Sequence, residues 1–110
     1  MNKIIQKLKS NSSTSFQEVI NYIDENYLFT PTGFKNGNQY NEAGQNNGSC
    51  KVFAYAQLNN LSKEDTLLLF AEHYQSVLNT PKATEHQNIR NFIELGWEAI
   101  KFEGVALKEK

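Results

Sequence analysis

The segment SCKVFAYAQLN, residues 49–59, decides the fold because it carries apolar side chains on both sides of a predicted helix. Cys50 and Phe53 fall on one side of this helix, and Val52 falls on the other. A helix that is apolar all round is covered by its neighbours rather than lying on the surface. We therefore expect this helix to be central in the domain, with Ser49 as its N-cap.

Two amphipathic helices are predicted, one before and one after this segment. Ser15 with Glu18, and Ser62 with Asp65, have the spacing of a capping box, in which the first side chain accepts a hydrogen bond from the backbone of the second residue. The apolar residues at helical intervals are Phe16, Val19, Ile20, Ile23 and Tyr27 in the first helix, and Leu67, Phe70, Ala71, Tyr74, Val77 and Leu78 in the second. Pro81 ends the second helix, because proline disfavours helical backbone in the residue before it.

Two further helices are predicted nearer the ends of the chain. Residues 1–9 combine apolar and basic side chains at helical spacing. Thr84 and Gln87 mark the start of another helix, and Gly96 is suited to its end. Residues 100–102 are compatible with either a short strand or an extended tail. The predicted fold is thus mainly α, with about five helices around one core.

A long polar segment separates the two halves of this arrangement. Residues 29–48 contain four Gly and five Asn. These residue types favour turns and left-handed backbone, so we expect a long irregular loop. A short hairpin at Asn36-Gly37 is the alternative, because Asn-Gly is the preferred sequence of a two-residue hairpin turn.

Composition bounds the classes of function. A chain of 110 residues with 39% hydrophobic residues can bury one core, and we expect one domain over residues 1–110. A net charge of −1 provides no basic surface for nucleic acid. The longest apolar run, residues 67–71, is far shorter than the roughly 20 residues of a membrane span. A single cysteine and no recognisable signal peptide favour a reducing compartment, the cytoplasm.

The chain resembles the HopJ type III effector protein family. The longest matching phrases are FTPTGFKNG at residues 29–37, NEAGQNNGSCK at 41–51 and HQNIRNF at 86–92. Shorter matches lie at Leu61-Ser62, Thr66-Leu67, Gly96-Trp97, Ile100 and residues 102–104. The resemblance covers residues 16–107 and leaves residues 1–15 as an N-terminal helix and linker.

This resemblance implies a small single-domain protein of a family named after effectors that type III secretion systems deliver. It implies no reaction and brings no catalytic residues. The chain departs from the family pattern at Gly33, where Ala is usual, and at His73 with Gln75, where Tyr and Arg are commoner.

Candidate chemistry begins at Gly48-Ser49-Cys50, which resembles the Gly-Ser-Cys of papain-like proteases, with His86 and Asn88 downstream. A small thiol-dependent enzyme that uses Cys50 and His86 is therefore one hypothesis. The favoured interpretation of Cys50 is a small buried hydrophobic residue of the central helix. The two histidines, His73 and His86, have no carboxylate at ligand spacing, so we expect neither a metal site nor a cofactor.

The leading hypothesis is a non-enzymatic binding or interaction module for a small ligand or a protein partner. An ordered loop has many backbone groups to satisfy, and amide side chains both donate and accept hydrogen bonds. We predict that the loop folds against the start of the last helix and opens a polar cleft beside Cys50. The candidate binding residues are Asn36, Asn41, Asn46, Cys50, His86, Asn88 and Arg90. Arg90 serves either to bind the ligand or to satisfy carbonyl groups of the loop.

Overall fold

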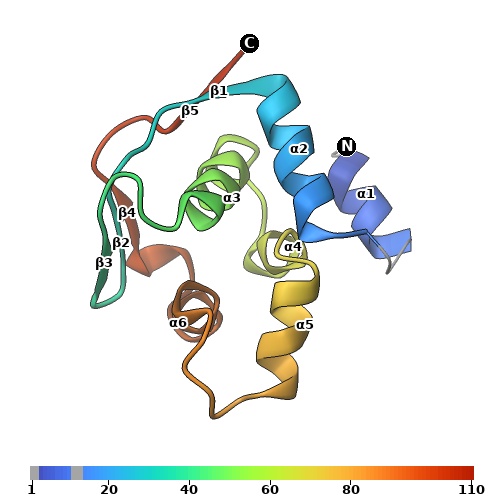
Figure 1. Ribbon diagram of the computed structural model, residues 1–110, viewed down its shortest axis with the longest axis vertical. Helices are drawn as coiled ribbons and strands as arrows, with labels where there is room; N and C mark the ends of the chain where they lie inside the picture. The colour runs from blue at the N-terminus through green and yellow to red at the C-terminus, as the bar shows by residue number, and fades with distance from the viewer. Residues whose placement is uncertain (1–2, 11–13) are drawn as a thin grey trace.

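The protein is α+β in the computed structural model, which describes residues 3–10 and 14–110 (Figure 1). Its helices are α1 (Lys3–Ser10), α2 (Phe16–Asn26), α3 (Asn47–Leu58), α4 (Lys63–Leu68), α5 (Glu72–Asn79), α6 (Gln87–Leu95) and the short 3-10 helix η1 (Gly96–Ala99). Its strands are β1 (Tyr27–Phe29), β2 (Phe34–Asn36), β3 (Gln39–Asn41), β4 (Ile100–Phe102) and β5 (Leu107–Glu109). The prediction of a mainly α fold, with about five helices and a possible short C-terminal strand, is wrong.

The strands form two small antiparallel sheets. One sheet has the order β3-β2-β4, and the other pairs β1 with β5. Asn36 pairs with Gln39 across a tight turn at Gly37, whose φ of 67° suits glycine. The predicted irregular loop is therefore a hairpin at its centre, the alternative that the Asn36-Gly37 pair suggested. The tail that follows the last helix supplies one strand to each sheet.

The helix α3 is the centre of the fold, as predicted. Its residues Cys50, Val52, Phe53, Ala54, Tyr55 and Ala56 are all buried. It packs against α2, α4 and β5, and Figure 1 shows it between α2 and the strands. The Phe53 ring contacts the rings of Phe34, Phe70, Phe92 and Trp97, which come from four other segments of the chain. One aromatic side chain thus connects α3 to most of the core.

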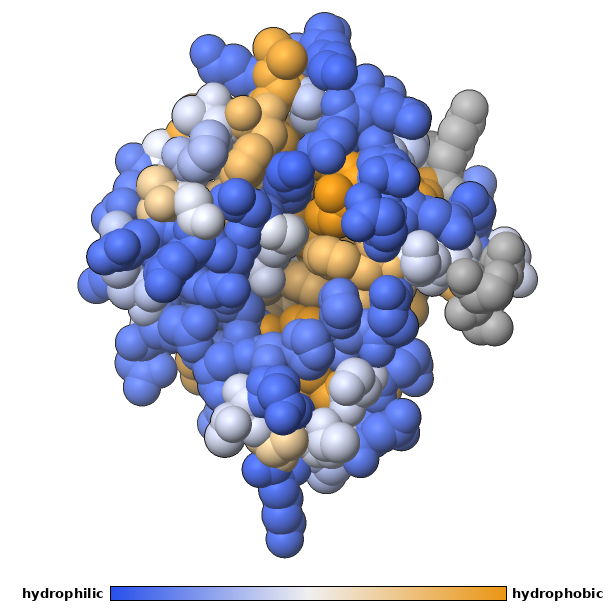
Figure 2. Space-filling model, viewed as in Figure 1, coloured by the Kyte–Doolittle hydropathy of each residue, from blue (hydrophilic) through white to orange (hydrophobic). Residues whose placement is uncertain are grey.

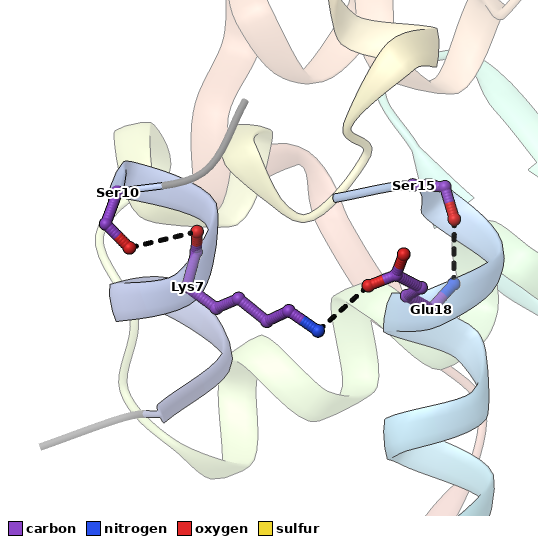
Figure 3. A network of polar contacts seen from close by, with 4 residues as sticks. All are labelled: Lys7, Ser10, Ser15 and Glu18. Atoms are coloured by element: carbon purple, nitrogen blue, oxygen red, sulfur yellow. Dashed lines mark hydrogen bonds and ion pairs between the residues drawn. The ribbon is translucent and has the colours of Figure 1, made fainter. Parts of the chain in front are cut away.

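Both predicted capping boxes begin their helices. The Ser15 hydroxyl accepts a hydrogen bond of 3.2 Å from the backbone N–H of Glu18, and Ser62 accepts one of 3.1 Å from Asp65. The Glu18 carboxylate also forms a 2.9 Å ion pair with Lys7 of α1 (Figure 3). Lys9 pairs with Asp65 at 3.2 Å, so α1 is fastened to the first turns of α2 and α4.

The helix predicted after Ser62 is broken in two. Its first part, α4, ends at Leu68, and Ala71 adopts a positive φ of 49° before α5 begins. Both Leu67 and Leu69 are buried, although residues two apart lie on nearly opposite faces of a continuous helix. The break lets both leucines enter the core. None of the helices in the described residues has the length and apolar character needed to cross a membrane.

Candidate functional site

A network of buried asparagine side chains joins the β2-β3 hairpin to α6. Asn36 and Asn41 are 0% exposed and Asn88 is 5% exposed. Asn36 Nδ2 donates to the backbone oxygen of Asn88 at 2.8 Å and to its Oδ1 at 3.1 Å. Asn88 Nδ2 donates to Asn41 Oδ1 at 2.9 Å, and Asn41 Nδ2 donates back to Asn88 Oδ1 at 3.2 Å. These bonds fix the hairpin on the first turn of α6.

The network extends to the start of α3. Asn46 Nδ2 donates to Asn41 Oδ1 at 2.6 Å, and Asn91 Nδ2 donates to the backbone oxygen of Asn36 at 2.9 Å. The structure therefore brings together four of the residues that the sequence selected: Asn36, Asn41, Asn46 and Asn88. Buried amide groups in proteins are mostly hydrogen-bonded, and those of Asn41 and Asn88 are, while Asn36 Oδ1 has no partner in the described structure. The bonds that are made hold the starts of α3 and α6 to the hairpin.

A cleft of about 390 Å³ lies beside this network, where α3 and α6 begin. Its polar lining comes from Gln39, Asn46, Ser49, Gln87 and Asn88. In Figure 2, viewed as in Figure 1, the region between α3, α5 and α6 is hollowed, with apolar surface bordered by hydrophilic residues. None of the described residues that line the cleft is Asp, Glu, Lys or Arg.

Aromatic rings form another part of the lining. The rings of His73 and His86 lie 4.8 Å apart, and the ring of Phe16 lies 4.8 Å from that of His73. Phe16 also stacks on Phe70 at 6.0 Å. Sequence reasoning missed this group, because Phe16 and Phe70 fit apolar helix stripes and only tertiary packing shows that they also reach a cleft.

The imidazole of His86 favours its neutral form. Partial removal from water lowers its pKa below the ordinary value of 6.5, the nearby His73 and Arg90 lower it further, and Glu85 opposes them. A neutral imidazole offers one donor and one acceptor instead of a positive charge. No group of three or more His, Cys, Asp or Glu side chains that could hold a metal ion occurs among the described residues.

Neither helix at the cleft starts at the predicted cap. The N-cap of α3 is Asn46, with φ of 50°, and that of α6 is His86, with φ of 58°. The predicted caps, Ser49 and Thr84, are therefore wrong. The side chains of the observed caps accept no hydrogen bond from their helices. Backbone N–H groups in the first turn of an uncapped helix are available to water or to a ligand.

Cys50 does not line the cleft. Its side chain is 1% exposed, and its Sγ donates a hydrogen bond of 3.5 Å to the backbone oxygen of Thr32. Burial raises the pKa of this thiol, which disfavours the reactive thiolate. Cys50, one of the predicted binding residues, is therefore not among the residues that line the cleft, although Gly48 and Ser49 before it are. These observations weigh against a thiol enzyme that uses Cys50 with His86.

Arg90 satisfies carbonyl groups, but those of a different segment from the one predicted. Its Nε donates to the backbone oxygen of Glu85 at 2.6 Å, and its Nη1 donates to that of Thr80 at 2.7 Å. Nη2 donates to the Thr80 hydroxyl at 3.1 Å. Arg90 thus holds the connection between α5 and α6, and it makes none of its hydrogen bonds with residues 29–48 in the described structure.

Comparisons with known proteins agree with the sequence motifs. The crystal structure of VPA0580, described as a protein of unknown function, superposes with a TM-score of 0.91 at 46% identity, over 100% of this chain and 95% of that one. No curated protein matches the chain significantly. The sequence profile of the HopJ type III effector protein family matches residues 1–107. The chain belongs to the HopJ type III effector protein family.

Proposed function

We propose that the protein is a non-enzymatic binding module that holds a small polar ligand in the cleft at the starts of α3 and α6. The observation that carries this proposal is the buried asparagine network, which converges on the cleft from the hairpin and both helices. The cleft's volume of about 390 Å³ lies within the range of about 300–1,000 Å³ common for small-molecule sites. Buried hydrogen bonds hold the binding residues on rigid helices and strands. Such a preformed site loses less conformational entropy when a ligand binds.

The chemistry of the lining supports binding rather than catalysis. Amides, a serine and aromatic rings line the cleft, and the one thiol nearby is buried with a raised pKa. Nucleophilic catalysis requires a nucleophile within reach of a general base. Cys50 does not meet this condition with His86, because only the histidine lines the cleft.

Blocking the cleft tests the proposal. The variant Ser49→Phe places a ring where the half-buried Ser49 lines the cleft, and Ser76→Phe places the same ring on the exposed face of α5. Thermal unfolding is measured with a panel of nucleosides, monosaccharides and amino-acid amides. We expect panel members to raise the melting temperature of wild type and Ser76→Phe but not of Ser49→Phe. Equal stabilisation of all three proteins would contradict the proposal.

Membership of the HopJ family also supports a proposal about export, namely that a type III secretion system delivers the protein. The full chain, with an epitope tag at its C-terminus, is followed in culture supernatants of bacteria with and without a working secretion ATPase. Export should require the ATPase. Equal amounts in both supernatants, or none in either, would overturn this proposal and leave the cleft proposal untouched.

A further inference from the structure

Backbone carbonyls fix the direction of the buried amides. Asn36 Nδ2 donates to the backbone oxygen of Asn88 at 2.8 Å, and Asn91 Nδ2 donates to that of Asn36 at 2.9 Å. Asn41 Nδ2 donates to the backbone oxygen of Phe34 at 3.4 Å. A carbonyl oxygen can only accept, so the NH₂ group of each of these amides must face the backbone. The side-chain oxygens of Asn41 and Asn91 are thereby left to accept from the next amides outward.

Those next amides line the cleft. Asn41 Oδ1 accepts from Asn46 Nδ2 at 2.6 Å and from Gln39 Nε2 at 3.4 Å. Asn91 Oδ1 accepts from Gln87 Nε2 at 2.7 Å. Each of these cleft amides therefore turns its NH₂ nitrogen toward the protein and uses one of its two N–H groups there. Their own side-chain oxygens receive no hydrogen bond from any described residue, which leaves Gln39, Asn46 and Gln87 as hydrogen-bond acceptors at the cleft.

A ligand that complements these acceptors must donate hydrogen bonds without carrying a positive charge. The described lining contains no carboxylate to pair with a cation. The starts of α3 and α6 carry the positive ends of helix dipoles, which also disfavour a cation. A neutral N–H donor meets both conditions. An acceptor on the same ligand can be served by the Ser49 hydroxyl or by first-turn backbone N–H groups.

The ring cluster of Phe16, His73 and His86 favours a flat ligand. The ring of His73 lies 4.8 Å from that of Phe16 and 4.8 Å from that of His86, and His86 is exposed. Aromatic faces stack favourably on planar bases. From this geometry we propose that the cleft binds a neutral planar heterocycle bearing an exocyclic amine next to a ring nitrogen, the chemistry of adenine and cytosine. This ligand class rests on the proposed function and narrows it.

Matched nucleosides test the ligand class. Adenosine carries an exocyclic amine beside an unprotonated ring nitrogen, and inosine carries a carbonyl beside a ring N–H. Cytidine and uridine differ in the same way. Binding is measured by titration calorimetry and by backbone amide shifts of ¹⁵N-labelled full chain. We expect at least one amino nucleoside to bind about tenfold or more tightly than its carbonyl partner, because a carbonyl would face the acceptors of Gln39, Asn46 and Gln87.

Two variants separate the amide contribution from the ring contribution. Gln87→Met removes the acceptor oxygen at similar side-chain length, and Gln75→Met makes the same change on the exposed face of α5. His86→Asn removes the ring while keeping a residue that tolerates the φ of 58°. We expect Gln87→Met to lose most of the preference for the amine and Gln75→Met to keep it. His86→Asn should weaken amino and carbonyl nucleosides alike.

The outcomes also separate this inference from the proposed function. Equal or tighter binding of inosine and uridine would overturn the ligand class. The ligand class would also be overturned if glucose or alaninamide shifted the backbone amides of residues 48, 49, 87 and 88 while every nucleoside left them unchanged. The proposed binding function would stand in that case. If nucleosides, glucose and alaninamide all leave these amides unchanged at millimolar concentration, both proposals fail.

Discussion

Asn88→Ala tests the amide network from which the site is built. The substitution removes three side-chain hydrogen bonds, two accepted by Oδ1 from Asn36 and Asn41 and one donated by Nδ2 to Asn41. At a net contribution of ~0.5–1.5 kcal/mol for each bond, the free energy of unfolding should fall by about 2–4 kcal/mol. The backbone oxygen of Asn88 still accepts from Asn36, which keeps the loss below that of a fully orphaned amide.

Urea unfolding followed by tryptophan fluorescence and by circular dichroism measures this loss. The matched control is Asn79→Ala at the exposed end of α5, which should change the free energy of unfolding by less than about 0.5 kcal/mol. Amide hydrogen exchange should also speed up in β2 and β3 of Asn88→Ala, but not in β1 and β5, which form the other sheet. A loss no larger than that of the control would refute the reasoning that this network holds the hairpin on α6.

Three further predictions concern single side chains. Cys50 should react with a thiol reagent slowly in the folded protein at pH 7.5 and rapidly in urea, because it is buried with a raised pKa; fast labelling of the folded chain would contradict its assignment to the core. The folded-state pKa of His86 lies below the unfolded value of about 6.5. Between these two pKa values the unfolded chain binds more protons than the folded chain, so this group should lower the free energy of unfolding as the pH falls. Imidazole shifts measured against pH would report that pKa, and a value above 6.5 would contradict the sign. Gly33→Ala should displace Glu103 from Tyr40, because an added Cβ would meet both the Glu103 carboxylate and the Tyr40 hydroxyl; the pKa of Tyr40, which that hydrogen bond raises, should then fall toward 10.0 in an ultraviolet titration. An unchanged Tyr40 titration would show that the pair is not broken.

Local chemistry accounts for the parts of the fold that the sequence predicts well. The caps at Ser15 and Ser62 involve residues three apart, and the burial of α3 follows from apolar residues on both its faces. Gly96, predicted as the end of a helix, has a φ of 70° directly after α6. Each of these features depends on residues within a few positions of one another.

Apart from the local β2-β3 hairpin, the strand pairings were harder to predict, because the paired strands are distant in sequence. β1 pairs with β5 near the other end of the chain, and each strand is only three residues long, too short to display an alternating pattern. The starts of α3 and α6 were misplaced for a related reason. Their N-caps, Asn46 and His86, adopt left-handed backbone without capping their helices, a conformation that tertiary contacts select.

The candidate site divides in the same way. A count of polar groups in the Asn-rich segment was enough to predict that it folds against the start of α6. Asn36 and Asn41 bond to Asn88 there, and Asn46 bonds to Asn41. The ring cluster could not be predicted, because it gathers Phe16, His73 and His86 from three helix starts that only the folded chain brings together. Arg90 donates hydrogen bonds to backbone carbonyl groups, as predicted. These carbonyls belong to Thr80 and Glu85, in the connection between α5 and α6, and not to the hairpin.

Residue-resolved amide NMR tests the central claim, that the cleft at the starts of α3 and α6 is the binding site, most directly. Spectra of the ¹⁵N-labelled protein are recorded with increasing amounts of pooled neutral polar compounds that include nucleosides. The account predicts saturable shifts at Gly48, Ser49, Gln87 and Asn88, which line the cleft, and none in β1 or β5. Saturable shifts confined to other surfaces, or no saturable shift anywhere, would contradict it.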